Sequence, residues 1–162
     1  MIRRITELSM LLALSIILSI IESFVPTYVP GVKLGLANII ILIMIYMYTI
    51  KDAFVLLILR VMIVSLLLGS FMSVTFFMSV SGGLFAIITM VILKSLGFNV
   101  ISTSISGAVM HGVGQILIAI ILIAKESIYY LPVIMILSIF TGIFTGFITL
   151  RFMRIMEKKQ EE

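Results

Sequence analysis

Long apolar runs, separated by short breaks, make up most of this 162-residue chain. A membrane-spanning helix needs about 20 predominantly apolar residues, with a range of roughly 17–25. Glycine, proline and charged residues mark the breaks, the first of which runs from Val25 to Gly31. The breaks divide the chain into six predicted spans: Ile5–Phe24, Leu34–Tyr48, Ala53–Leu68, Phe76–Leu93, Ile101–Ile123 and Tyr129–Leu150. The second span is short, and a charged tail over 151–162 follows the sixth.

Composition points to the same class. Hydrophobic residues make up 62% of the chain and charged residues 11%, and the mean hydropathy is +1.37. An ordinary soluble domain has about 25% charged residues, and a soluble chain of this length would leave much of its apolar surface in water. The sequence therefore predicts an all-α integral membrane protein with one domain over residues 1–162.

The positions of the lysines and arginines predict the orientation. With the N-terminus inside, only Lys33 and Lys125 lie on the outer side. The inner side holds Arg3, Arg4, Lys51, Lys94, Arg151, Arg154, Lys158 and Lys159. Because cytoplasmic loops carry the excess of Lys and Arg, both termini are predicted to be cytoplasmic. The net charge of +4 then reflects topology, and no nucleic-acid partner is expected.

The chain lacks the residues that several kinds of chemistry require. The chain has no cysteine and one histidine, so we expect no disulfide, metal or cofactor site. It has one aspartate, Asp52, and its six glutamates are dispersed, whereas prenyl diphosphate synthesis needs clustered carboxylates to hold Mg²⁺. It also has no P-loop motif. We therefore expect no enzyme activity, and any ATP-driven step must use another subunit.

Arg60 is the polar residue placed deepest in a predicted span. It lies eight residues beyond Asp52, about 12 Å into the membrane at 1.5 Å per residue. A charged side chain at the centre of a span costs about 2.5–3.5 kcal/mol on insertion scales. Three hypotheses stay open: Arg60 extends to the inner headgroups, forms an ion pair with Glu22, or fixes an anionic group of a substrate.

Other polar residues converge near the predicted outer surface. Glu22 ends the first span, where it either caps the helix or faces a site, and Lys33 and Asn38 follow the break. His111 and Gln115 are four residues apart and share one helix face. They either bind a ligand or join helices by hydrogen bonds. The predicted substrate-binding set is Glu22, Lys33, Asn38, Arg60, His111 and Gln115.

Small residues at four-residue spacing predict close helix packing, since they let backbones approach each other in lipid. Two such stripes lie on the fifth and sixth spans: Ser104, Ala108 and Gly112, and Ser138, Gly142 and Gly146. We expect both stripes to pack inside the protein. Ser9 and Ala13 form a similar pair on the first span, and there internal packing and contact with a partner protein stay open.

The string Gly31-Val32-Lys33-Leu34-Gly35-Leu36-Ala37-Asn38 resembles a known bacterial family. Ile21-Glu22 and the prolines Pro26 and Pro30 precede it. The family is called Gx transporter, or heptaprenyl diphosphate synthase component I, and the resemblance runs from Arg4 to about Arg151. Residues 107–115 are similar to the family pattern Gly-Ala…His-Asn-x-Gly-Gln, with Gly112 where Asn is usual.

This family is similar to the substrate-binding S-components of energy-coupling-factor vitamin transporters. The resemblance implies six membrane helices in the bacterial plasma membrane and a small-molecule site near the outer surface. It implies a lid between the first two spans, which holds Pro30, Gly31 and Gly35. It also implies that Ser9 and Ala13 dock on a membrane coupling protein driven by two cytoplasmic ATPases, although the relatives have Ala where this chain has Ser9.

Three functions are compatible with these features. The leading hypothesis is the substrate-binding membrane subunit of an ATP-driven importer for a small vitamin- or quinone-precursor-like molecule. The first alternative is a membrane scaffold for a prenyl- or quinone-synthesis or electron-transfer assembly. The second is a solitary proton-coupled carrier.

Overall fold

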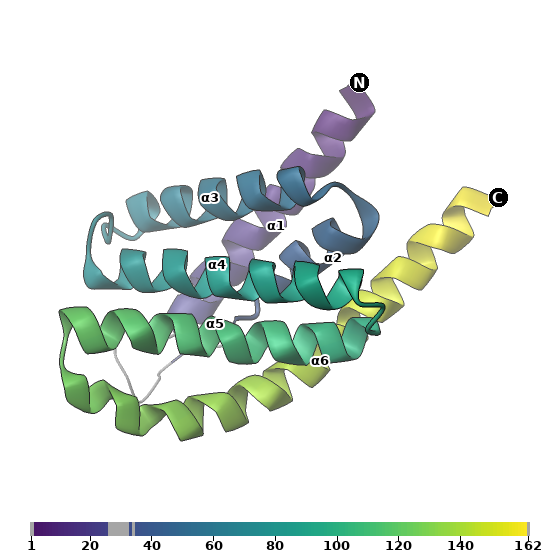
Figure 1. The fold of residues 1–162 in the computed structure, drawn as a ribbon. Coiled ribbons are helices and arrows are strands. Elements are labelled where there is room, and N and C mark those ends of the chain that lie inside the picture. Colours follow the sequence, from purple (N-terminus) through teal and green to yellow (C-terminus); the bar gives the residue numbers. More distant parts are fainter. Residues whose placement is uncertain (1, 26–32, 34, 162) are drawn as a thin grey trace.

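The computed structural model describes residues 2–25, 33 and 35–161, which form six α-helices, one 3-10 helix and no strand. The helices are α1 (Ile2–Ser23), α2 (Asn38–Met47), α3 (Ile50–Leu67), α4 (Val74–Ser95), α5 (Val100–Leu122), η1 (Lys125–Tyr130) and α6 (Leu131–Glu161). Helices α3, α4 and α5 run side by side, and α6 follows α5 (Figure 1). The predicted all-α class is confirmed.

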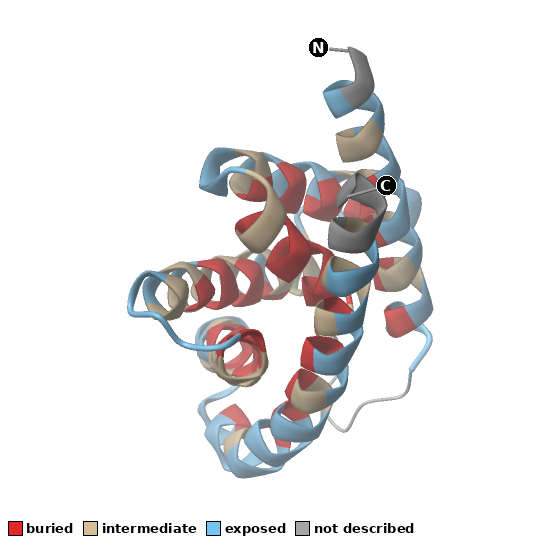
Figure 2. Ribbon diagram, turned by 90° about the vertical axis from the view of Figure 1, so that its right-hand side faces the viewer, coloured by how far each residue is buried: buried red, intermediate tan, exposed pale blue. Residues whose placement is uncertain are grey.

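Four segments are long and apolar enough to cross a membrane: Arg4–Ser23, Val74–Ser95, Val100–Leu122 and Lys125–Met156. In these segments polar side chains face the interior of the bundle and apolar side chains face outward. On α1, Ser15 and Glu22 are buried, whereas Ile17 and Ile21 are each 53% exposed. Figure 2 shows buried residues facing the centre of the bundle and exposed residues around its outside. Apolar side chains on the outside suit a lipid environment, so the protein is a multi-pass membrane protein.

Helix α2 is short and central. Its 10 residues are about 15 Å long at 1.5 Å per residue, roughly half of the 30 Å hydrocarbon core of a bilayer. Residues 39–45 are all buried, as expected for a helix that is apolar on every side. It contacts α1, α3, α4, α5 and α6. The second predicted span is therefore a short buried helix that begins later than expected.

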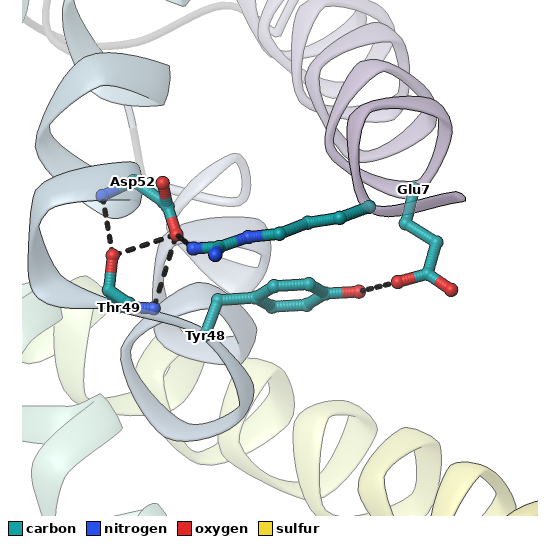
Figure 3. Close-up of polar contacts among 5 residues, drawn as sticks. Glu7, Tyr48, Thr49 and Asp52 are labelled. Atoms are coloured by element: carbon teal, nitrogen blue, oxygen red, sulfur yellow. Dashed lines mark hydrogen bonds and ion pairs between the residues drawn. The ribbon is translucent and has the colours of Figure 1, made fainter. Parts of the chain in front are cut away.

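Helix α3 begins earlier than the third predicted span, which starts at Ala53. Lys51 and Asp52 lie in the first turn of α3 and not in a turn before it. The reason is a capping box. The hydroxyl of Thr49 accepts a hydrogen bond from the Asp52 N–H (3.2 Å), and the Asp52 carboxylate accepts one from the Thr49 N–H (3.4 Å; Figure 3).

The turn between α2 and α3 also anchors the beginning of α1. Arg4 Nη2 lies 2.6 Å from Asp52 Oδ2, and the Tyr48 hydroxyl donates a hydrogen bond to Glu7 Oε2 over 3.1 Å. Figure 3 shows the Tyr48 and Glu7 side chains extending toward each other between the two elements. Both contacts are polar and lie at one end of the bundle.

Small residues bring α4, α5 and α6 together. A methyl group on Gly114 would lie 2.8 Å from the Ser81 carbonyl oxygen on α4. One on Gly142 would lie 2.6 Å from the Ile105 Cα on α5. The Ser104 and Thr145 hydroxyls are 2.7 Å apart across the α5–α6 interface. The predicted internal packing of both stripes is confirmed.

The charged end of the chain is not a separate tail. Helix α6 continues through 151–161, so most of the segment predicted as a tail extends the last helix. Arg151 and Arg154 are exposed there. The two chain ends lie on the same side of the bundle (Figure 2).

Candidate functional site

A pocket lies where α1, α3, α4 and α5 meet residues 33 and 35–37, which we call the pre-α2 segment, and the first residue of α2. The cavity has a volume of about 30 Å³, inside a wider space of about 470 Å³ that includes open solvent. A cavity of this size holds one or two water molecules. Its apolar wall is formed by Ala37, Val61, Val64 and Phe76.

Five of the six predicted substrate-binding residues line this pocket: Glu22, Lys33, Asn38, Arg60 and His111. The sixth, Gln115, lies at its edge, where its side-chain oxygen accepts a hydrogen bond from the Lys33 N–H over 3.2 Å. Of the residues predicted to form the lid, Gly35 lines the pocket. Pro30 and Gly31 lie outside the described residues.

Glu22 ties α1 to the pre-α2 segment. Its carboxylate accepts hydrogen bonds from the backbone N–H groups of Gly35 and Leu36, the latter over 3.1 Å. Gly35 has a φ of +88°, a left-handed conformation that favours glycine. A methyl group there would lie 3.0 Å from Asn38 Nδ2. The absence of a side chain at Gly35 therefore lets the segment turn tightly above the pocket.

Three side chains in the pocket carry buried polar atoms without a hydrogen-bond partner among the described residues. They are Arg60 at Nη1, Asn38 at Nδ2 and His111 at both ring nitrogens. Arg60 and His111 are 4% exposed and Asn38 is 3% exposed. A buried polar group left unsatisfied costs about 1–3 kcal/mol. Such groups are uncommon in proteins, so this cluster makes the pocket the candidate functional site.

Two serine hydroxyl groups that line the same pocket do have hydrogen-bond partners. Ser65 donates a hydrogen bond to the Met62 carbonyl (2.9 Å), and Ser79 donates one to the Thr75 carbonyl (2.8 Å). Sequence reasoning did not assign these two serines to the site. Their spacing from the preceding carbonyls is ordinary for a helix, and an apolar helix gives no signal of which serine faces inward. The unsatisfied atoms thus belong to the residues with amide, imidazole and guanidinium groups.

The structure decides among the hypotheses for Arg60. The side chain is buried, so it does not extend to the headgroups. Among the described residues, an ion pair joins Arg4 and Asp52, and the Glu22 carboxylate is bound to backbone N–H groups. Arg60 therefore makes no direct ion pair with Glu22 within the described part of the chain. Arg60 is a buried cation with a free donor facing a cavity.

His111 and Gln115 differ in their contacts. The Gln115 side-chain oxygen binds the Lys33 N–H, whereas its side-chain nitrogen and both ring nitrogens of His111 have no side-chain hydrogen-bond partner among the described residues. The choice between ligand binding and helix joining therefore stays a prediction. Lys33 lies next to this group in the pre-α2 segment. Burial lowers the pKa of the Lys33 ammonium group, and the nearby Glu22 carboxylate opposes that shift.

A second hollow lies near the beginning of α1. It has a volume of about 200 Å³ and lies between α1, α3 and the end of α2. Ser9 lines it, and Leu8, Leu12, Val55 and Leu59 give it an apolar surface. Ser9 and Ala13 are both exposed. Ser9 and Ala13 therefore face outward, unlike the stripes on α5 and α6.

The sequence matches the model of one protein family. The model described as heptaprenyl diphosphate synthase component I matches residues 11–152, which include the whole of the described pocket. No curated protein and no solved structure matches the chain. Because the matched region covers most of the sequence, the chain belongs to the heptaprenyl diphosphate synthase component I family.

Proposed function

We propose that this protein is the substrate-binding membrane subunit of an ATP-driven importer, similar to an S-component. In this proposal its six helices lie in the bacterial plasma membrane, with both termini in the cytoplasm. It captures a small vitamin- or quinone-precursor-like molecule from outside. A membrane coupling protein and two cytoplasmic ATPases, which are separate chains, drive release on the inside.

The observation that carries this proposal is the pocket with its unsatisfied buried groups. Arg60, Asn38 and His111 come from three helices and face one cavity. The pre-α2 segment lies over the cavity and is fastened by Glu22. Ligand sites are mostly apolar hollows with a few polar groups that fix orientation. Among the described residues, the side-chain hydrogen bonds that hold the segment are two to Glu22 and one to Gln115. Such a segment suits a lid, because it opens without unfolding a helix.

The exposed face of α1 supports the proposed docking of a membrane coupling protein. Ser9 and Ala13 lie on the surface beside an apolar hollow of about 200 Å³. Small residues let a second helix approach closely in a membrane. The hollow also lies near the Arg4–Asp52 ion pair, at the end of α1 opposite Glu22. A partner bound there would therefore contact the inner side while the pocket opens to the outer side.

The name of the family contains a synthase, but we propose no catalytic role for this chain. The described residues contain no group of three histidine, aspartate or glutamate side chains that could hold a metal ion. Asp52 lies beside Arg4, whereas Glu22 lies 18 residues further along α1, about 27 Å at 1.5 Å per residue. Carboxylates that far apart do not share a Mg²⁺ ion with a diphosphate.

Affinity purification from a native bacterial membrane tests the proposal. We expect the tagged protein to bring with it a membrane coupling protein and two ATPases. Ser9→Leu should reduce the recovered partners at least fivefold, because the added bulk fills the docking surface. Ser23→Leu is the matched control, since Ser23 is exposed at the opposite end of the same helix. It should leave the recovery unchanged.

Two results would overturn the import proposal. Recovery of a prenyl- or quinone-synthesis enzyme without ATPases would favour the scaffold that the family description suggests. Uptake of substrate into vesicles that lack ATP, driven by a pH gradient, would favour a proton-coupled carrier. Loss of the partners with Ser23→Leu as well as Ser9→Leu would remove the assignment of the docking face.

A further inference from the structure

We propose that the pocket binds a ligand through a carboxylate group, which Arg60 holds as its counter-ion. The inference rests on the proposed function only in taking this pocket as the binding site. It adds the chemical class of the molecule: a carboxylic acid that is bound as a monoanion, with Asn38 and His111 as the other polar contacts.

The free hydrogen-bonding atoms define what the pocket lacks. A guanidinium nitrogen and an amide nitrogen are donors only. Arg60 Nη1 and Asn38 Nδ2 therefore both need an acceptor, and a neutral His111 adds one further donor and one acceptor. A carboxylate accepts about four hydrogen bonds on two oxygens and has no donor of its own. Arginine also matches the planar shape of a carboxylate better than lysine does.

The charges lead to the same conclusion. Lys33, Arg60 and Glu22 all line the pocket, so two cationic side chains face one acidic side chain. Glu22 is already engaged by the backbone of the pre-α2 segment. A buried charge without a partner is costly. One added negative charge would give Arg60 a partner and balance the group.

The size of the cavity limits what enters it without movement. About 30 Å³ is space for one or two waters, so the cavity has room for an isolated carboxylate and little more. A larger acid would place its carboxylate here and its remaining atoms in the wider space around the cavity, which includes open solvent. A small acid is therefore a suitable probe of the polar part of the site.

Thermal unfolding of the purified full-length protein in detergent tests this inference. The additives are sodium acetate, acetamide, sodium chloride and sodium phosphate, each at the same concentration. Acetamide has nearly the shape of acetate but no charge. If acetate binds with a Kd of about 10 mM, then 100 mM acetate stabilises the folded state by a factor of about 11, or about 3–6 °C in Tm. We expect that shift with acetate and less than 1 °C with acetamide or chloride.

Three variants assign the effect to Arg60. Arg60→Gln should abolish the acetate shift, and Arg60→Lys should keep part of it, because the charge remains while the paired donors are lost. Lys94→Gln is the control for the loss of a cation. Lys94 donates to the Ile45 carbonyl over 2.5 Å and lies 5.1 Å from the Tyr46 ring centre, away from the pocket lining. This variant should have a lower Tm but the full acetate shift.

Several outcomes would overturn the inference. They are an equal shift with acetamide or chloride, no shift with acetate, and a full acetate shift in Arg60→Gln. A larger shift with phosphate would replace the carboxylate by a phosphate group. If Arg60→Gln does not fold, two measurements still test the inference. They are the comparison of acetate with acetamide in the wild type and the reduced acetate shift in Arg60→Lys. Recovery of the ATPases without an acetate effect would refute the carboxylate ligand but not the importer proposal. An acetate effect without recovery of the ATPases would refute the importer proposal but not the carboxylate ligand.

Discussion

The fastening of the pre-α2 segment by Glu22 gives the sharpest prediction. Glu22→Gln keeps the shape of the side chain and an oxygen that can accept from Gly35 and Leu36. What it removes is the negative charge. We expect the segment to open more often in this variant, and the amide hydrogens of these two residues to exchange faster with solvent.

The magnitude follows from the two hydrogen bonds that the carboxylate accepts. Hydrogen bonds to charged groups contribute about 1.5–3 kcal/mol each, against about 0.5–1.5 kcal/mol for neutral ones. Losing about 1 kcal/mol in each bond makes opening easier by about 2 kcal/mol. Since 1.36 kcal/mol corresponds to a factor of ten, exchange should become roughly 30-fold faster.

Hydrogen–deuterium exchange followed by mass spectrometry measures this effect in detergent. Exchange of these amides reports local opening, which costs less than global unfolding. Glu126→Gln is the matched control, because Glu126 is an exposed carboxylate in η1. It should leave exchange in the pre-α2 segment unchanged. If exchange at Gly35 and Leu36 stays within threefold of the wild type in Glu22→Gln, the carboxylate does not fasten the segment.

Two further predictions concern glycines. Gly142→Ala should destabilise the protein by about 1–3 kcal/mol, the usual cost of overpacking, because its methyl group meets the α5 backbone at 2.6 Å. Gly146→Ala should cost less, since its nearest contacts are at 3.1 Å, and equal unfolding midpoints would contradict this ranking. Gly35→Ala should cost about 1–2 kcal/mol, because left-handed backbone disfavours side chains, and should speed exchange at Leu36. Unchanged exchange there would show that the turn tolerates a side chain.

Part of the site could be predicted from single residues. Glu22, Arg60 and His111 stand out because each interrupts an apolar run, and a bilayer accepts such groups only where they face protein or water. The partners of these residues are harder to predict. The sequence is compatible with an ion pair between Arg60 and Glu22, yet Glu22 binds the backbone of Gly35 and Leu36. Backbone N–H groups are present at every residue, so the sequence does not signal which ones a carboxylate will bind.

The membrane class and most helices can be predicted from the sequence, because the length of an apolar run and its polar interruptions decide whether a segment is stable in lipid. The fold was needed to show that α2 is a short central helix and that Arg60, Asn38 and His111 share one cavity. The difference arises from how each helix is rotated about its axis. In helices that are apolar nearly all round, hydrophobic periodicity does not specify that rotation, and close packing against Gly82, Gly114 and Gly142 does.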